Sequence, residues 1–178
     1  DADTQEEWVF NDEHSSENTI ESGLELLDTA DVIAGHNVIN YDLVVLEKLM
    51  GWKPKAEVRD TLILSRLIHS NMFERDLVRR KTDLDFPPKM TGRHSLKAWG
   101  YRLGILKGLH IENHGFEKWT PELESYCLQD VKITAELWYR LTNDNYSEVS
   151  IKLEHEFAKI MTLQEQRGIG FDVPAASE

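Results

Sequence analysis

Residues 36–42, HNVINYD, place polar side chains directly after the short apolar run 31–35. The run predicts a buried strand, and ligands of open α/β sheets bind where such strands end. There the Asp42 carboxylate could ligate a hard cation, and the Asn37 amide could donate and accept hydrogen bonds. The same residues are also typical of an Asn/Asp turn followed by a helix, so a binding site and a structural turn both stay open at this point.

Tyr126 and Asp130 are four residues apart in the sequence YCLQD, which puts both on one face of an expected helix. An aspartate inside a helix has low propensity and no capping role, so Asp130 indicates a site or an ion pair. Tyr126 by itself is typical of core packing. A third acid, Asp60, lies at the end of the expected strand 57–61, where the pattern favours a cap for the next helix over a site.

The sequence lacks the motifs of several kinds of chemistry, which excludes them. The seven histidines form neither an HExxH pair nor a zinc-spaced cluster with cysteine. The sequence also has no P-loop, no GxGxxG and no GxSxG. The lone Cys127 excludes an internal disulfide framework, which fits a reducing compartment. No apolar stretch approaches the ~18 residues of a membrane span.

Charge is distributed unevenly along the 178 residues. The chain has 20 Lys+Arg against 32 Asp+Glu, a net charge of −12, which argues against non-specific wrapping of nucleic acid. Residues 75–97 differ, because seven basic and three acidic side chains give this segment a charge of +4. The segment is either an exposed loop with scattered charge or a patch that faces phosphate. Its candidate nucleic-acid contacts are Arg79, Arg80, Lys81 and Arg93.

Alternating strands and helices must position these residues, which predicts an α/β class. Strands are expected over 7–10, 31–35 and 57–61, and a first helix is expected to start near Ser15-Ser16-Glu17. Further helices are expected over 42–50, 62–69, 95–103, 120–141 and 147–168. Residues 71–91 lose their periodicity, which predicts either a long loop or a partly ordered excursion, and 108–118 are expected to be irregular.

The last two expected helices have apolar stripes that predict which faces point inward. In the helix 120–141 the stripe includes Cys127, Val131, Ala135, Trp138 and Leu141. In the helix 147–168 it is made of Val149, Leu153, Phe157 and Ile160.

Taken together, these segments resemble the DnaQ-like 3′–5′ exonuclease superfamily, in its tyrosine-containing DEDD branch. HNVINYD resembles the second exonuclease motif and YCLQD the third, in the right order. Between them, RDTLILSRLIHSN and GRHSLKAWGYRLG resemble the proofreading domains of phage-type family A DNA polymerases. After them, EHEFAKIMTLQEQRGIGFDVPAA resembles the segment that leads toward the polymerase domain in that family.

The resemblance implies an RNase H-like mixed sheet flanked by helices and two-metal hydrolysis of a single-stranded DNA 3′ end. Mg²⁺ or Mn²⁺ would be held by Asp130 and Asp42, and Tyr126 would orient the attacking water. The pocket for the terminal nucleotides would be shaped by His36, Asn37 and Tyr41. The intact protein would carry a polymerase domain in cis and act in the cytoplasm of a bacterial or phage-infected cell.

One departure from the family changes the expectation for the domains. The family's first motif, Asp-x-Glu on the opening strand, does not occur in the sequence. We therefore expect residues 1–146 to be an exonuclease domain without its opening strands and 147–178 to be a helix and linker, with little hydrolysis by residues 1–178 alone. The alternatives are a catalytically silent exonuclease-like module that binds DNA or acts as a scaffold, and an RNA-directed exonuclease of the same superfamily.

Overall fold

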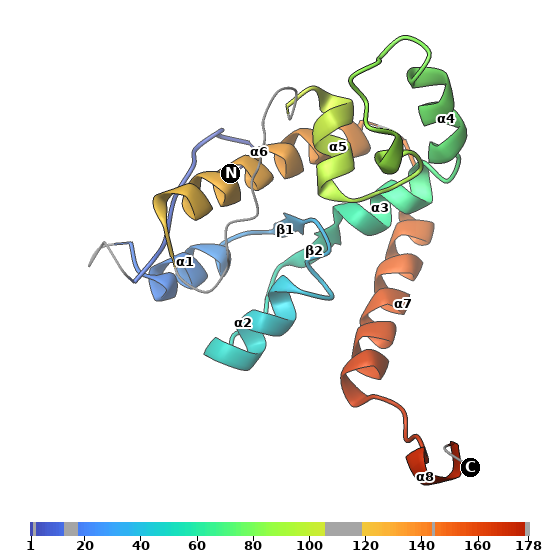
Figure 1. Ribbon diagram of the computed structural model, residues 1–178. Coiled ribbons are helices and arrows are strands. Elements are labelled where there is room, and N and C mark those ends of the chain that lie inside the picture. The colour runs from blue at the N-terminus through green and yellow to red at the C-terminus, as the bar shows by residue number, and fades with distance from the viewer. Residues whose placement is uncertain (2, 13–17, 106–118, 144, 177–178) are drawn as a thin grey trace.

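A computed structural model describes residues 1, 3–12, 18–105, 119–143 and 145–176. Figure 1 shows helices gathered around a small sheet, with the last long helix extending away from the others. The elements, in chain order, are α1 (Ile20–Leu27), β1 (Val32–Gly35), α2 (Asp42–Met50), β2 (Glu57–Asp60), α3 (Thr61–Ile68), α4 (Met72–Arg79), the 3₁₀ helix η1 (Pro88–Met90), α5 (Leu96–Leu103), α6 (Pro121–Thr142), α7 (Glu148–Arg167) and α8 (Val173–Ala176).

The sheet is a parallel pair, β1 and β2, connected through α2. Its register pairs Val32 with Glu57 and Gly35 with Asp60, so both strands end at the same edge. The α/β class is confirmed, as are the strands expected over 31–35 and 57–61. The described residues hold these two strands alone, and an RNase H-like mixed sheet stays a prediction.

Helix boundaries follow local capping chemistry. The hydroxyls of Ser95, Thr120 and Ser147 accept a backbone N–H from the third residue beyond each cap, which starts α5, α6 and α7. Gly51 and Gly104 adopt the left-handed conformation that ends α2 and α5. The helices predicted at these positions are confirmed.

The N-terminal part differs from expectation. Residues 7–10 form no strand, since none of the described strands pairs with them, and Phe10 packs instead on α1. A Cβ at Gly23 of that helix would lie 2.8 Å from the Phe10 ring, so a larger residue there would displace it. Helix α1 begins at Ile20 with Thr19 as its cap, whereas the predicted start at 15–17 and the predicted irregular stretch 108–118 lie outside the described residues.

Of the two alternatives for 71–91, the long loop is wrong and the partly ordered excursion is right, because parts of this segment fold into α4 and η1. A buried ion pair holds it: the Arg102 guanidinium donates from Nε and Nη2 to the two Asp76 oxygens, at 3.0 and 2.6 Å. The same guanidinium also lies over the rings of Phe86 and Trp99. These contacts join residues far apart in sequence, so periodicity within the segment could not reveal them.

The main core lies between α3, α5, α6 and the first half of α7. It is made of Leu64, Met72, Trp99, Ile133, Leu137, Leu141 and Ile151. On α6 the buried positions are thus 133, 137 and 141. The predicted stripe was right at Leu141 and at Trp138, which packs against this core, but wrong at Val131 and Cys127, which are exposed. Among the described residues no helix is long and apolar enough to span a bilayer.

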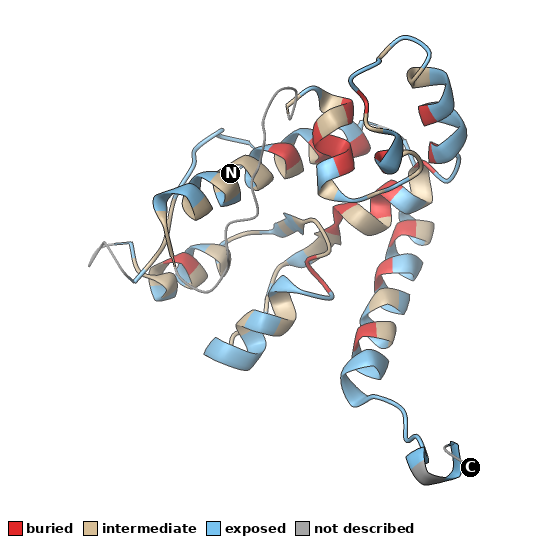
Figure 2. Ribbon diagram, in the orientation of Figure 1, coloured by how far each residue is buried: buried red, intermediate tan, exposed pale blue. Residues whose placement is uncertain are grey.

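Helix α7 presents the face opposite to the one predicted. Val149, Leu153, Phe157 and Ile160 are 57–79% exposed, whereas Ile151, His155 and Thr162 are buried. Figure 2 shows the buried positions of α7 only on the side toward the other helices. Both faces of this helix carry apolar residues, so its packing partners rather than its own sequence decide which face is covered.

Candidate functional site

The paired ends of β1 and β2 bring two predicted segments together. Because Gly35 and Asp60 are in register, the chain leaves β1 into residues 36–41 beside the point where β2 enters α3. Figure 1 shows this junction where β1, β2, α2 and α3 meet. The carboxyl ends of parallel strands are the usual place for a ligand in such sheets.

The Asp60 carboxylate accepts three backbone hydrogen bonds at this junction. The side chain is buried, and its Oδ1 accepts the N–H of Leu62 at 2.9 Å, which confirms the predicted helix cap. The same carboxylate also accepts the N–H of Asn37 on Oδ1 at 2.9 Å and that of Ile39 on Oδ2 at 3.1 Å. Asp60 therefore holds the predicted site segment from the neighbouring strand, a role that the spacing within either segment does not show.

His36 is fixed by a short relay of hydrogen bonds. The Thr61 hydroxyl donates to the Gly35 carbonyl at 3.1 Å, so it accepts from His36 Nδ1, 3.0 Å away. Burial lowers the pKa of His36 to about 4, an effect that the charge of Asp60 partly offsets. A neutral imidazole here brings no positive charge to a phosphate.

Asn37, Tyr41 and Asp42 follow on a tight turn. Asn37 has φ +62°, a left-handed conformation that asparagine tolerates better than most residues. Tyr41 is 65% exposed, so its ring is accessible to a ligand. Asp42 is the first residue of α2, and its pKa lies above the ordinary value because its surroundings displace water and because Asp60 is negative.

Tyr126 and Asp130 lie on one face of α6, as their spacing predicts. Partial burial raises the pKa of Asp130, an effect that hydrogen bonding from the Tyr126 hydroxyl partly offsets. Burial and the neighbouring negative charge raise the pKa of Tyr126 above its usual value. The raised pKa keeps the Tyr126 hydroxyl protonated at neutral pH, so it is a hydrogen-bond donor beside Asp130.

The two halves of the site come from elements in contact, since α6 packs against β1. Carboxylate oxygens are the donors that Mg²⁺ and Mn²⁺ prefer, so Asp42 and Asp130 have the right chemistry for a divalent cation. Two ligand side chains are too few for a metal site, however. Over the described ranges no group of three or more His, Cys, Asp or Glu side chains is arranged to hold a metal ion. Two carboxylates alone would be only part of the ligand set that a divalent cation needs.

The candidate basic residues are distributed over the folded segment 72–93. Arg79 is in the last turn of α4 and lies 3.6 Å from Asp83, Arg80 caps the same helix, and Lys81 is exposed after it. Arg93 is also exposed, and its carbonyl accepts from Arg102 at 2.7 Å. Arg102 thus holds the backbone of this basic segment in place, because it pairs with Asp76 and also donates to the Arg93 carbonyl.

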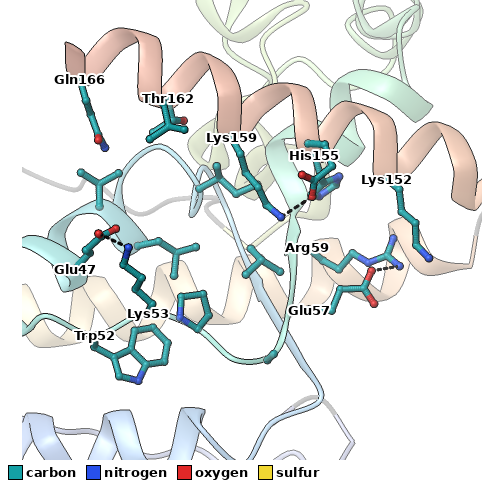
Figure 3. Close-up of a pocket in the computed structure, with 18 of the residues that line it drawn as sticks. Glu47, Trp52, Lys53, Glu57, Arg59, Lys152, His155, Lys159, Thr162 and Gln166 are labelled. Atoms are coloured by element: carbon teal, nitrogen blue, oxygen red, sulfur yellow. Dashed lines mark hydrogen bonds and ion pairs between the residues drawn. The ribbon is translucent and has the colours of Figure 1, made fainter.

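Two cavities lie away from the candidate metal ligands Asp42 and Asp130, and the first includes Arg79 of the basic segment. One, of about 320 Å³, is lined by four arginines among other residues, namely Arg75, Arg79, Arg102 and Arg140. The other, of about 420 Å³, lies between α2, β2 and α7 and contains none of the predicted site residues. Figure 3 shows its polar wall, where Lys53 pairs with Glu47 and Arg59 with Glu57, each at 2.7–2.8 Å.

Comparison with known proteins gives one kind of relative. No protein-family model matches the sequence. The sequence is similar to the DNA-directed DNA polymerases of Escherichia phage T7 and Enterobacteria phage T3, with 31% identity over 188 aligned residues in each case. The alignment covers 83% of this chain but 27% of either polymerase, so the chain spans about a quarter of the length of these relatives. It is homologous to part of a phage DNA polymerase.

Proposed function

We propose that the chain is the proofreading 3′–5′ exonuclease domain of a phage-type family A DNA polymerase, which removes terminal nucleotides from a single-stranded DNA 3′ end. The observation that carries this proposal is the placement of Tyr126 and Asp130 on one face of α6, in a chain homologous to part of a phage DNA polymerase. Residues 1–146 would form the exonuclease domain, and 147–178 would lead toward a polymerase domain in the cytoplasm of a bacterial or phage-infected cell.

The roles proposed for the site residues follow from their environments. Tyr126 is a phenol at neutral pH, so its hydroxyl can orient a water molecule near Asp130. Asp130 and Asp42 would belong to the ligand set of two divalent ions, Mg²⁺ or Mn²⁺. Asn37 and the exposed Tyr41 ring would contact the terminal nucleotides beside His36.

The charge of the molecule is compatible with this substrate. Its net charge of −12 disfavours broad binding to phosphate, so contacts to DNA would concentrate on the basic segment. That segment is folded rather than a mobile loop, since the Asp76–Arg102 pair and α4 fix it. Its proposed DNA contacts are Arg79, Arg80, Lys81 and Arg93.

The test is a nuclease assay on the whole gene product that contains this sequence. A 5′-labelled single strand is incubated with Mg²⁺ or with Mn²⁺, and shortening from the 3′ end is followed on a gel. We expect Asp130→Ala and Asp42→Ala to reduce shortening at least about 100-fold, while Asp31→Ala, a change on the exposed surface, has no effect. Full activity in Asp130→Ala would overturn the proposal.

A second function is favoured by one observation, the lack of a group of three metal-ligating side chains over the described residues. On this alternative the domain is a catalytically silent module that binds DNA or acts as a scaffold. The same assay separates the two, because binding of the labelled strand without any shortening by the whole gene product favours the silent module. A parallel RNA strand tests the third possibility, since a site can discriminate the 2′-hydroxyl locally.

A further inference from the structure

We propose that Asp60 is a positioning residue of the candidate site, which fixes segment 36–39 and through it the Asp42 carboxylate, and that His155 of α7 fixes Asp60 in turn. This inference rests on the proposed function for its catalytic consequence. Its structural part, the hydrogen bonding at Asp60, stands on geometry alone.

A helix cap explains only one of the three backbone hydrogen bonds that Asp60 accepts. The N–H of Leu62 belongs to the capped helix α3, but the N–H groups of Asn37 and Ile39 lie across the sheet, 23 and 21 residues earlier in the chain. Both carboxylate oxygens are engaged, and the residue is 2% exposed. Hydrogen bonds from backbone N–H groups to a charged acceptor are stronger than neutral ones, so these contacts fix a loop effectively.

Segment 36–39 needs such support because its backbone is under constraint. Asn37 is held at φ +62°, a sparsely populated region for a residue with a side chain. Gly35 lies directly before the segment, and a Cβ at this position would be 2.7 Å from the Cβ of Val38. This short distance shows how tightly the turn closes. Helix α2 begins with Asp42 only three residues after Ile39, so the position of this turn sets that of the Asp42 backbone.

His155 completes the arrangement from the other side. The Asp60 N–H donates to His155 Nε2 at 2.8 Å, so that nitrogen is an acceptor and the ring carries its proton on Nδ1. Nδ1 in turn donates to the Ile151 carbonyl, also at 2.8 Å. The imidazole is 4% exposed, and Figure 3 shows it on the side of α7 that faces β2. Helix α7 is thereby connected by one hydrogen bond to the residue that holds segment 36–39, and the bond to Ile151 within the same helix fixes the ring that makes it.

The test compares Asp60→Asn with wild type in the whole gene product. Asparagine keeps an oxygen for the N–H groups of Asn37 and Leu62 but places an NH₂ group against the N–H of Ile39. Relative to wild type, we therefore expect the substitution to increase amide hydrogen exchange at Ile39 more than at Asn37. We also expect a fall of about 10–100-fold in kcat/KM on a labelled single strand. Asp60→Ala should affect both amides and reduce activity further.

Asp28→Asn is the matched control. Asp28 is half-buried and also accepts two hydrogen bonds, from Trp52 Nε1 at 3.0 Å and from Lys55. Its substitution should leave kcat/KM and the exchange at Ile39 unchanged. His155→Gln should increase exchange at the Asp60 N–H and reduce kcat/KM less than Asp60→Asn does.

The outcomes separate this inference from the proposed function. If the wild-type protein shortens no DNA, the proposed function fails and the exchange measurements alone decide whether Asp60 holds segment 36–39. Unchanged exchange at Ile39 in Asp60→Asn would overturn that hydrogen bonding. Faster exchange with wild-type kcat/KM would overturn the positioning role, and if Asp60→Ala does not fold, Asp60→Asn still gives each of these results.

Discussion

The contribution of the Tyr126 hydroxyl to the reaction can be tested separately from the packing of its ring. Removing the hydroxyl in Tyr126→Phe keeps the ring, which is only partly buried, and so leaves the free energy of unfolding within about 0.5 kcal/mol of wild type. If the hydroxyl orients the attacking water, kcat for 3′ shortening falls about 100-fold. Tyr146→Phe, which removes an exposed hydroxyl, is the control. Equal kcat values for the two variants would contradict the role of Tyr126.

His36 makes stability depend on pH. Its pKa is about 4 in the folded chain against 6.5 in the unfolded chain, because burial disfavours the charged ring. Between these values the unfolded chain binds a proton that the folded chain does not, so the free energy of unfolding falls as pH drops from 6.5 toward 4 and is unaffected by His36 above 6.5. Allowing for partial exposure, the loss at pH 4 is about 2 kcal/mol.

Urea unfolding at pH 7.5 and pH 4.5 measures this effect. His94 and His155 contribute in the same direction, since burial also lowers the pKa of each. His36→Gln keeps a side-chain donor for Thr61 but does not titrate, so it should remove the His36 part of the loss. The same pH dependence in wild type and His36→Gln would show that His36 is not responsible.

At the scale of secondary-structure elements, the sequence predicts boundaries better than faces. The starts at Thr120 and Ser147 are confirmed because capping depends on atoms within a few residues. The inward face of α7 was predicted wrongly because the outward face is the more apolar one, and contacts with α3 rather than hydrophobic periodicity decide which face is covered. At the site, the cap at Asp60 could be predicted, whereas its bonds to Asn37 and Ile39 depend on the register of β1 with β2.

Helix α4 and η1 depend on one buried ion pair. Asp76 and Arg102 have side chains 1% and 3% exposed, so Asp76→Ala leaves an uncompensated guanidinium in the interior. Breaking one partner of a buried pair costs about 3–5 kcal/mol, and the loss here should also loosen the contact with Gly92, whose N–H Asp76 accepts at 2.8 Å. We expect urea unfolding of Asp76→Ala to show this loss.

The control for that experiment is Asp83→Ala, which removes the partner of Arg79 from a partly exposed ion pair in the same segment. An ion pair that water still reaches contributes less than about 1 kcal/mol, so this variant should unfold closer to wild type than Asp76→Ala does. Similar values for Asp83→Ala and Asp76→Ala would show that the buried pair does not hold α4 and η1 in place.

For the whole molecule, a net charge of −12 and a local charge of +4 make opposite predictions about DNA. If the basic segment forms the contacts, affinity for a single strand depends on it and not on total charge. Each phosphate contact adds about 0.7 to the slope of log K against log salt for single strands, so removing four contacts lowers the slope by about 3. The test variant replaces four residues by alanine: Arg79, Arg80, Lys81 and Arg93.

A matched variant separates the effect of where the basic residues lie from the effect of the net charge. It carries the same four-charge change, to a net −16, but removes four lysines outside segment 75–97, namely Lys48, Lys53, Lys152 and Lys159. Fluorescence anisotropy of a labelled single strand over a range of salt concentrations measures both slopes. We expect the slope to fall only in the first variant, because counterions are released where phosphates are bound and not in proportion to net charge. An equal fall in both variants would mean that DNA responds to the overall field, and the basic segment would then lose its proposed role as the strand contact.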